Sequence, residues 1–578
     1  MDLIIKGGEI VDGTGAPKFR GDVGVKDGKI VAVGKVEGTA KCTVDAEGAV
    51  VTPGFVDIHT HYDGQVSWDA MLAPSSINGV TSTAMGNCGV GFAPARADKH
   101  DFLIRLLEGV EDIPGTALHE GLTWDWESFP DYLDAISRRA YAIDIGAHVP
   151  HAPLRTYVMG DRGGDHTATP TADEIERMRQ LTYEALQAGA LGFSTTRTMF
   201  HRTKDGQNVG TLTASEDELL GITRALDQAG RGVIQLISDA YLTNDDEFAA
   251  RELSLIRSLA AQTGRKLSFT VQQNDDAPDR WRQIFQEIVG MRAAGLDVSA
   301  QVAPRPIGAI LSFSTSMTPY IACPTYIKLS ATLRGESLVA ELNKPEVKAQ
   351  ILSEHARVVN LTGNAGAITK GYMRMFRMND PVDYEPSAES SLQAEADRLG
   401  RNVDDYVYDT FLEDDGQRLI YLPFNNYSYG NLDDVYGMMT GPHALYGISD
   451  GGAHCGFICD ASFPTTTIGL WSKGSKSGYQ IPLEALVHGY TQRNARHVGW
   501  HDRGAIKVGQ LADLNVIDLG KLSLSPPEIV RDLPAGGTRL LQTAKGYRQT
   551  IKSGVVTFED GKWTGETPGK LVRGEQFA

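Results

Sequence analysis

Two histidines separated by one residue are the clearest candidates for metal ligands in this chain. His59 and His61 follow the apolar stretch Gly54-Phe55-Val56-Asp57-Ile58, which predicts a buried strand. Because side chains alternate along a strand, both imidazoles point to the same side. Such a pair suits a zinc site, although two strand-end histidines satisfied by hydrogen bonds would show the same pattern.

Two further residues can complete such a site. Cys88 lies in a turn of small residues at the end of the next predicted strand. A buried cysteine is usually an inert apolar side chain, but a thiolate beside two histidines is a strong zinc ligand. Asp450 ends the last predicted strand, where a carboxylate can bind a metal and accept a proton from water. A helix cap or a turn is the alternative role for Asp450.

Other polar residues follow predicted strands or lie in a long insertion. His148 and His151 close the third predicted strand, where either can polarise a carbonyl or serve as a packing or capping residue. Arg197 follows the fourth strand and either binds a carboxylate or pairs with a surface acid. The predicted catalytic residues are Asp450 and His151, and the predicted substrate-binding residues are Arg197, His201, Asn426 and Tyr427.

These residues need a scaffold that brings strand ends together. Eight apolar stretches predict strands, at residues 54–63, 79–90, 142–150, 189–197, 232–238, 266–273, 296–303 and 444–451. Helical patterns separate several of them, at residues 171–188, 215–229, 246–263 and 279–294. Eight such units predict an α/β protein with a (β/α)₈ barrel, whose active sites lie at the C-terminal ends of the strands.

Both ends of the chain differ from the middle. Short alternating strands within residues 1–52 predict a small antiparallel sheet, and residues 504–578 show the same pattern. We therefore expect one β-sandwich domain built from both ends, around a barrel over residues 53–503. Residues 307–443 are too long for a barrel connection, and their helical patterns at 335–358 and 387–412 predict an inserted lid.

Composition narrows the partners and the compartment. The 578 residues carry a net charge of -18, which disfavours nucleic acid and anionic membranes as partners. The start lacks the pattern of a signal peptide and no stretch is apolar enough to span a bilayer, so we expect a cytoplasmic protein. We also expect a homo-oligomer. Five cysteines, an odd number, indicate reduced thiols.

Five motifs spread along nearly the whole chain carry a family resemblance. They are Ile4–Gly15, Thr52–His61, Gly86–Gly89, Gly189–Thr196 and Gly504–Asp513. Together they resemble the amidohydrolase superfamily, and within it the N-acyl-D-amino-acid deacylases. The resemblance implies a (β/α)₈ barrel with a β-sandwich and zinc-dependent hydrolysis of an amide. It also implies that His59, His61, Cys88 and Asp450 are the metal ligands.

The sequence departs from this family at two strands. The fifth and sixth strands of the family each end in a metal-binding histidine, but Gly232–Asp239 and Ser268–Asp275 contain none. Glutamine is a poor zinc ligand, so we expect one tightly bound Zn²⁺. The family's basic residue after the sixth strand is also missing, which argues against free N-acyl-D-amino acids as substrates.

The predicted function is therefore zinc-dependent hydrolysis of a linear amide, an N-acyl amino acid or a related N-acyl or aryl amide. Two alternatives stay open at this point. The first is hydrolysis of a cyclic amide of the hydantoin or dihydroorotate kind. The second is a non-catalytic protein that kept the fold after losing ligands.

Overall fold

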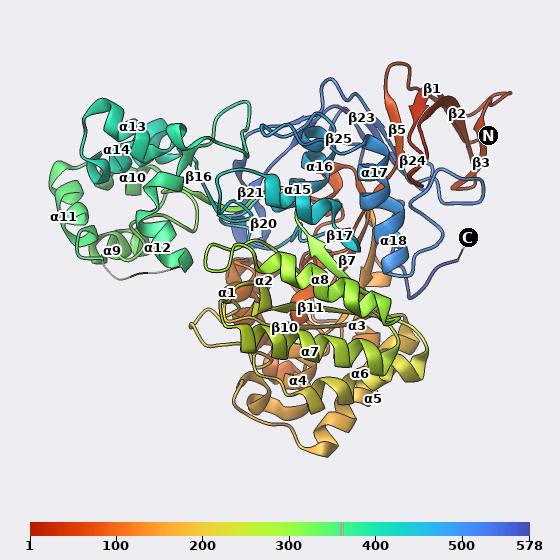
Figure 1. Ribbon diagram of the computed structural model, residues 1–578, viewed down its shortest axis with the longest axis horizontal. Helices are drawn as coiled ribbons and strands as arrows, with labels where there is room; N and C mark the ends of the chain where they lie inside the picture. Colours follow the sequence, from red (N-terminus) through yellow and green to blue (C-terminus); the bar gives the residue numbers. More distant parts are fainter. Residues whose placement is uncertain (359–360, 362, 578) are drawn as a thin grey trace.

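Parallel strands and helices alternate through the middle of the chain, as expected for the α/β class (Figure 1). The computed structural model describes residues 1–358, 361 and 363–577. The predicted segments 307–443 and 504–578 each contain positions outside these residues. Among the described residues, no helix is both long enough and apolar enough to cross a membrane.

Every one of the eight predicted strand stretches contains a strand. These are β6 (Phe55–Asp57), β7 (Val80–Met85), β8 (Asp144–Ala147) with β9 (Val149–Pro150), β10 (Gly192–Arg197), β11 (Val233–Ser238), β12 (Lys266–Thr270), β13 (Val298–Val302) and β17 (Ala444–Tyr446). They form two parallel sheets, in the orders β6-β7-β8 and β9-β10-β11-β12-β13-β17. The sheets meet twice, because only His148 separates β8 from β9 and because Thr60 pairs with Gly451.

Helices connect consecutive strands at the predicted places. They are α5 (Ala172–Ala188), α6 (Glu216–Ala229), α7 (Asp246–Thr263) and α8 (Arg280–Ala293). The side chains of Thr171, Ser215 and Asp245 accept hydrogen bonds from the first turns of α5, α6 and α7. Such caps satisfy amide groups that have no partner inside the helix, which fixes where each helix begins.

The two ends of the chain share one sheet, at the upper right of Figure 1. Its strands are β1 (Leu3–Ile10), β2 (Phe19–Lys26), β3 (Lys29–Gly34), β4 (Cys42–Asp45), β5 (Val50–Pro53), β18 (Leu514–Ile517), β23 (Tyr547–Lys552), β24 (Val555–Glu559) and β25 (Lys562–Trp563). The expectation of a purely antiparallel sheet was wrong, because β1 pairs in parallel with both β4 and β5. A hairpin of β20 (Glu528–Leu533) and β21 (Gly537–Leu541) follows β18.

The segment between β13 and β17 contains β14 (Ile307–Leu311), α9 (Pro324–Thr332), α10 (Glu336–Leu342), α11 (Pro345–His355), α12 (Gly363–Lys370), β15 (Phe376–Arg377), α13 (Leu392–Leu399), α14 (Val403–Gly416), β16 (Ile420–Asn425) and α15 (Asp433–Thr440). Helix α15 packs into the main core. Most of the remaining segment forms a side lobe, drawn in green to teal in Figure 1. Phe313, Tyr320 and Phe411 belong to its own buried core. The predicted helical patterns at 335–358 and 387–412 are each split into two helices. Pro345 starts α11 within the first, and Gly400 ends α13 within the second at a φ of 63°.

A buried ion network joins the terminal sheet to β8. Asp144 in β8 lies 2.7 Å from Arg503 Nη1 and 2.9 Å from Lys552 Nζ. Lys552 also contacts Asp513 at 2.8 Å. Since all four charged groups are buried, each depends on its partners for compensation of its charge.

Candidate metal centre

His59 and His61 lie just beyond the C-terminal end of β6, in a segment held by the chain that follows β17. The His61 amide donates to the Gly451 carbonyl oxygen at 2.8 Å, and the Asp450 amide donates to the His59 carbonyl oxygen at 3.1 Å. This ladder sets the two histidines side by side, with ring centroids 5.5 Å apart. It also brings Asp450 to them, although about 390 residues separate them in the chain.

Four potential ligand groups converge at this point. His59 Nε2 lies 3.3 Å from Cys88 Sγ and 3.2 Å from Asp450 Oδ1. His61 Nε2 lies 3.6 Å from the same Asp450 oxygen. Ligand atoms of His59, His61 and Cys88 all lie within 4.8 Å of one another, and all three side chains are buried. Nitrogen, sulfur and oxygen donors at these separations are a set that suits a divalent cation such as zinc.

A neighbouring glutamine fixes the orientation of His59. The Nδ1 atom of His59 lies 2.6 Å from the Oε1 atom of Gln301 in β13. Gln301 Nε2 in turn donates to Ser268 Oγ at 2.9 Å. Because the amide oxygen can only accept, His59 Nδ1 carries the proton and Nε2 keeps its lone pair for the centre. The sequence reasoning missed Gln301, whose only signal is a long polar side chain inside an apolar strand.

Glu111 faces the other histidine. It follows α1 (His100–Val110), is fully buried, and places Oε1 3.2 Å from His61 Nδ1. Neither atom has an aligned hydrogen-bond partner among the described residues. The second Glu111 oxygen lies 3.8 Å from His454 Nε2. Glu111 was also missed, because no spacing in the sequence connects this turn to a strand end.

Burial and the neighbouring charges act differently on the groups of the centre. Burial raises the pKa of the Cys88 thiol well above its ordinary value, and the charges of Glu111 and Asp450 add to that shift. Burial also lowers the pKa of His61 to about 4. For Asp450 burial works against ionisation, but the His59 and His61 imidazoles lower its pKa below the ordinary range. A cation held here would offset the buried negative charge that keeps the thiol protonated.

The glutamines at the fifth and sixth strands are engaged elsewhere. Gln235 Oε1 accepts the Cys88 amide at 2.8 Å, and Gln272 Oε1 accepts Asn425 Nδ2 at 2.5 Å. The oxygen is the only metal-binding atom of a glutamine side chain, so these contacts leave both residues poorly suited as ligands. They help to hold the Cys88 turn and the neighbouring insertion instead.

Two of the other predicted site residues, His151 and Arg197, use their polar groups in contacts within the protein. His151 is fully buried, with its ring nitrogens 2.9 Å from Thr195 Oγ1 and 3.1 Å from Glu218 Oε1, so both are already engaged. Arg197 forms a bidentate pair with Glu252, which argues against its binding a substrate carboxylate.

Of the remaining three predicted residues, one lines the cavity above the centre. His201 lines it and contacts Thr196 Oγ1 at 2.9 Å. Asn426 is buried and accepts the Gln273 amide at 2.7 Å, while the Tyr427 hydroxyl donates to the Pro386 carbonyl oxygen at 2.6 Å. Asn425, the residue before them, faces the cavity.

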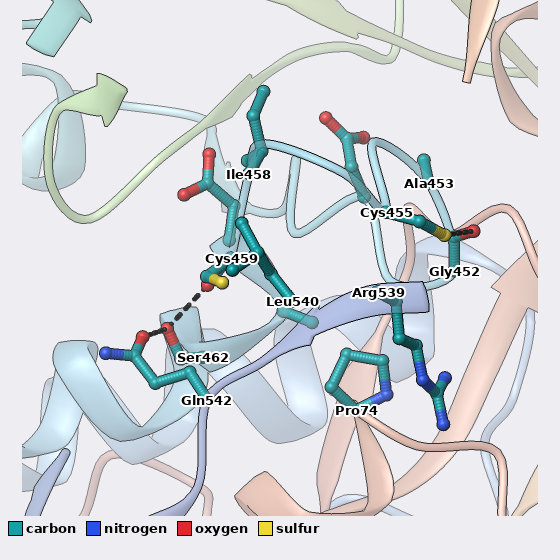
Figure 2. A pocket seen from close by; sticks show the side chains of 13 residues that line it. Pro74, Gly452, Ala453, Cys455, Ile458, Cys459, Ser462, Arg539, Leu540 and Gln542 are labelled. Carbon is teal, nitrogen blue, oxygen red and sulfur yellow. Dashed lines mark hydrogen bonds between the residues drawn. The ribbon is translucent and has the colours of Figure 1, made fainter. Parts of the chain in front are cut away.

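The loop after Asp450 rests on β21, as Figure 2 shows. Ser462 Oγ donates to Gln542 Oε1 at 2.7 Å, and the Leu540 amide donates to the Cys455 carbonyl oxygen at 2.7 Å. The cavity between loop and strand measures about 20 Å³, which is too small for a substrate. These contacts therefore hold the loop after Asp450 in place against β21.

A larger cavity of about 370 Å³ lies over the four ligand groups. Strand ends supply one side of its wall, with His59, His61 and Thr270 among them, and the insertion supplies another through β14, α12 and β16. Its size is that of a site for a small molecule. The arrangement places any bound molecule directly against the candidate metal centre.

Comparison with known proteins adds a family and a fold. The sequence model of the amidohydrolase family matches residues 42–558. A D-aminoacylase of Alcaligenes xylosoxydans xylosoxydans is 37% identical over 196 residues, which is 34% of this chain and 37% of the relative. An N-acyl-D-glutamate deacylase of the same organism is 31% identical over 316 residues, 53% of this chain and 57% of the relative. The matched segments thus span less than two thirds of either relative.

Two solved structures share the fold over 99% of both chains. One is a crystal structure of D-aminoacylase, with a TM-score of 0.64 and 23% identity. The other is N-acyl-D-glutamate deacylase from Bordetella bronchiseptica, complexed with zinc and a phosphonate inhibitor, with the same TM-score and identity. At this level of identity the likeness concerns the fold.

Proposed function

The chain belongs to the amidohydrolase family, and from this premise we propose that it hydrolyses linear amides with one bound zinc ion. The observation that carries the proposal is the convergence of two imidazoles, a thiol and a carboxylate at the floor of a 370 Å³ cavity. The names of the similar deacylases support amide hydrolysis as the reaction class.

The residues that would hold the ion are His59, His61, Cys88 and Asp450. Gln301 orients the first imidazole and Glu111 faces the second, as carboxylates and amides do behind metal-binding histidines. A divalent cation at this place supplies Lewis acidity, which lowers the pKa of water to about 7 and polarises a carbonyl.

Asp450 is the group placed to move protons. Its Oδ1 faces the two imidazoles, its Oδ2 lies 4.0 Å from His454 Nε2, and the side chain reaches the cavity. We infer that this carboxylate accepts a proton from the attacking water and then delivers it to the departing amine, which needs the proton to leave as a neutral molecule.

We propose one ion per chain because the strands that carry further ligands in the family offer Gln235 and Gln272 here, with both side-chain oxygens engaged. We further propose that the eight parallel strand positions form a (β/α)₈ barrel over residues 53–503, with the insertion at 307–443. In this proposal residues 1–52 and 504–578 form the β-sandwich and the protein is a cytoplasmic homo-oligomer.

Elemental analysis and a substrate panel test this function. The purified protein should contain about one zinc per chain, and removal of the ion by a chelator should abolish activity, which added Zn²⁺ should restore. The panel holds N-acyl amino acids, simple anilides and cyclic ureides, and we expect turnover of linear amides.

Two results would refute the proposal. The first is a protein without any transition metal whose activity a chelator leaves untouched. The second is turnover confined to the cyclic ureides, which would assign the chain to the cyclic-amide hydrolases instead.

A further inference from the structure

The 370 Å³ cavity is lined by carboxyl groups and by no side chain with a permanent positive charge among the described residues. Glu111, Asp112 and Asp450 line it, and no lysine or arginine does so among the residues that the structure describes. The basic side chains in its wall are imidazoles, which carry no permanent charge. A negatively charged ligand would therefore meet no fixed positive charge from the protein.

The bound zinc ion of the proposed function does not reverse this balance. The Cys88 thiolate and the Asp450 carboxylate would offset its two positive charges, and Asp112 and Glu111 remain nearby. Asp112 itself accepts hydrogen bonds from the Gly456 amide at 2.9 Å and from Ser316 Oγ at 2.8 Å, and both of these donors are neutral groups.

The rest of the wall is apolar or neutral. Ile237 lines it from β11 and Leu242 from the turn that follows, and Ile307, Leu422 and Phe424 line it from β14 and β16. Phe200 also lines it and is 56% exposed.

A neutral polar group completes the wall. Thr270 Oγ1 is buried without a hydrogen-bond partner among the described side chains, so it offers a hydroxyl to a carbonyl oxygen.

We propose that the substrate is an amide without a carboxylate on its amine half, an N-acyl amine or anilide with an apolar group. This inference rests on the proposed amide hydrolysis and narrows its substrate class. A carboxylate held in this cavity would lose its hydration and lie near other carboxylates without an ion-pair partner, which disfavours binding strongly. An apolar group of the same size would gain from burial against the isoleucine, leucine and phenylalanine side chains.

A matched pair of substrates tests the inference on the zinc-loaded protein at pH 8. N-acetyl-2-phenylethylamine and N-acetyl-D-phenylalanine differ only by the carboxylate beside the scissile bond. We expect kcat/KM to be at least about a hundredfold higher for the first, the scale on which a site rejects a group that it leaves unpaired. Equal values, or a preference for N-acetyl-D-phenylalanine, would overturn the inference.

A binding measurement separates this inference from the proposed function. If no linear amide is hydrolysed, the hydrolase proposal fails, while titration calorimetry with 3-phenylpropanol and 3-phenylpropanoate still reads the charge preference of the cavity. Tighter binding of the alcohol supports the inference, and equal or tighter binding of the acid contradicts it.

A new charge at the mouth gives a second test. Phe200→Lys should raise kcat/KM for N-acetyl-D-phenylalanine about tenfold relative to Phe200→Gln, which makes the same loss of aromatic surface without a charge. An unchanged preference between the two amides in Phe200→Lys would show that charge does not govern selection.

Discussion

Asp450 is a single residue with two tasks, since it completes the ligand set and carries the proton of the reaction. Asp450→Asn keeps the size of the side chain but removes its basicity. We predict that kcat falls by at least about a hundredfold, the usual scale for loss of a general base. Steady-state kinetics measures the loss, and elemental analysis of the same sample shows whether the zinc is still present. Near-normal turnover of a zinc-loaded Asp450→Asn protein would contradict the role.

Glu111 is predicted to act through His61 and not on the substrate. Glu111→Gln replaces the carboxyl group that lies 3.2 Å from His61 Nδ1 and orients that ring, so it should weaken zinc affinity by about 10- to 100-fold. Competition with a chromophoric chelator measures that affinity without reference to activity.

The matched control for Glu111 is Asp112→Asn. It makes the same chemical change on the next residue, whose carboxylate contacts Ser316 and Gly456. If Glu111→Gln binds zinc as tightly as the parent does, Glu111 has no role in the metal centre.

The residues that spacing singles out and those it misses differ in a physical way. His59 and His61 lie on one strand end, so their alternation is visible in the sequence. Glu111 and Gln301 reach the same place from a helix end and from a distant strand. Only the closed structure brings them there, and no local periodicity records such a contact. Arg197 shows the reverse case, because the sequence does not reveal that Glu252, 55 residues away, engages it.

At the scale of elements, the turn that follows β7 and carries Cys88 depends on one glycine. Gly89 follows Cys88 with a φ of +66°, and an added Cβ would lie 2.7 Å from the Thr195 Cα atom. Gly89→Ala should therefore shift the Cys88 turn and weaken zinc affinity by about tenfold or more.

Gly206→Ala separates the two causes in this prediction. Gly206 has a φ of +78° but no atom within 4 Å of an added Cβ, so the substitution strains the backbone without a clash. It should leave the zinc affinity of the parent intact. The chelator competition decides, and a Gly89→Ala protein that binds zinc as Gly206→Ala does would contradict the prediction.

Element positions followed from the sequence more readily than element limits and pairing. Hydrophobic runs located all eight strand positions because buried parallel strands are continuously apolar. Pro345 and Gly400 can be read in the sequence, but the prediction did not let them interrupt the two helical patterns of the insertion. The parallel pairing of β1 with β4 and β5 was not visible, because strand alternation carries no direction.

At the scale of the whole molecule, the Asp144 network holds the terminal sheet against the parallel sheets. Asp144→Asn removes one partner from buried Arg503 and Lys552, so the free energy of unfolding should fall by about 3–5 kcal/mol at pH 7. Denaturant titration measures it. Asp161→Asn is the control, because Asp161 is 96% exposed and its ion pair with Lys99 contributes little.

The same carboxylate predicts a pH dependence. Burial opposes its ionisation, but Lys552 and Arg503 lower the pKa of Asp144 below its ordinary value. A pKa that is lower in the folded state stabilises the protein above the unfolded pKa of about 4, and this contribution is lost as the pH falls below that value. The difference in unfolding free energy between parent and Asp144→Asn should therefore be constant from pH 7 to about 5 and shrink below about 4. A constant difference down to pH 3 would contradict the assignment.

The pairing of β5 with β18 bears on how the protein is made. Val51 of β5 pairs with Val516, so one edge of β5 stays open until the last part of the chain leaves the ribosome. At about 5–20 residues per second, that wait lasts roughly 20 to 90 s. During it an apolar strand edge is exposed to other nascent chains, which is the usual starting point of aggregation. Slow translation near the 3′ end of the message, or a shortage of chaperones, should therefore lower the yield of this protein more than that of one whose N-terminal strands need no partner from the C-terminal part of the chain.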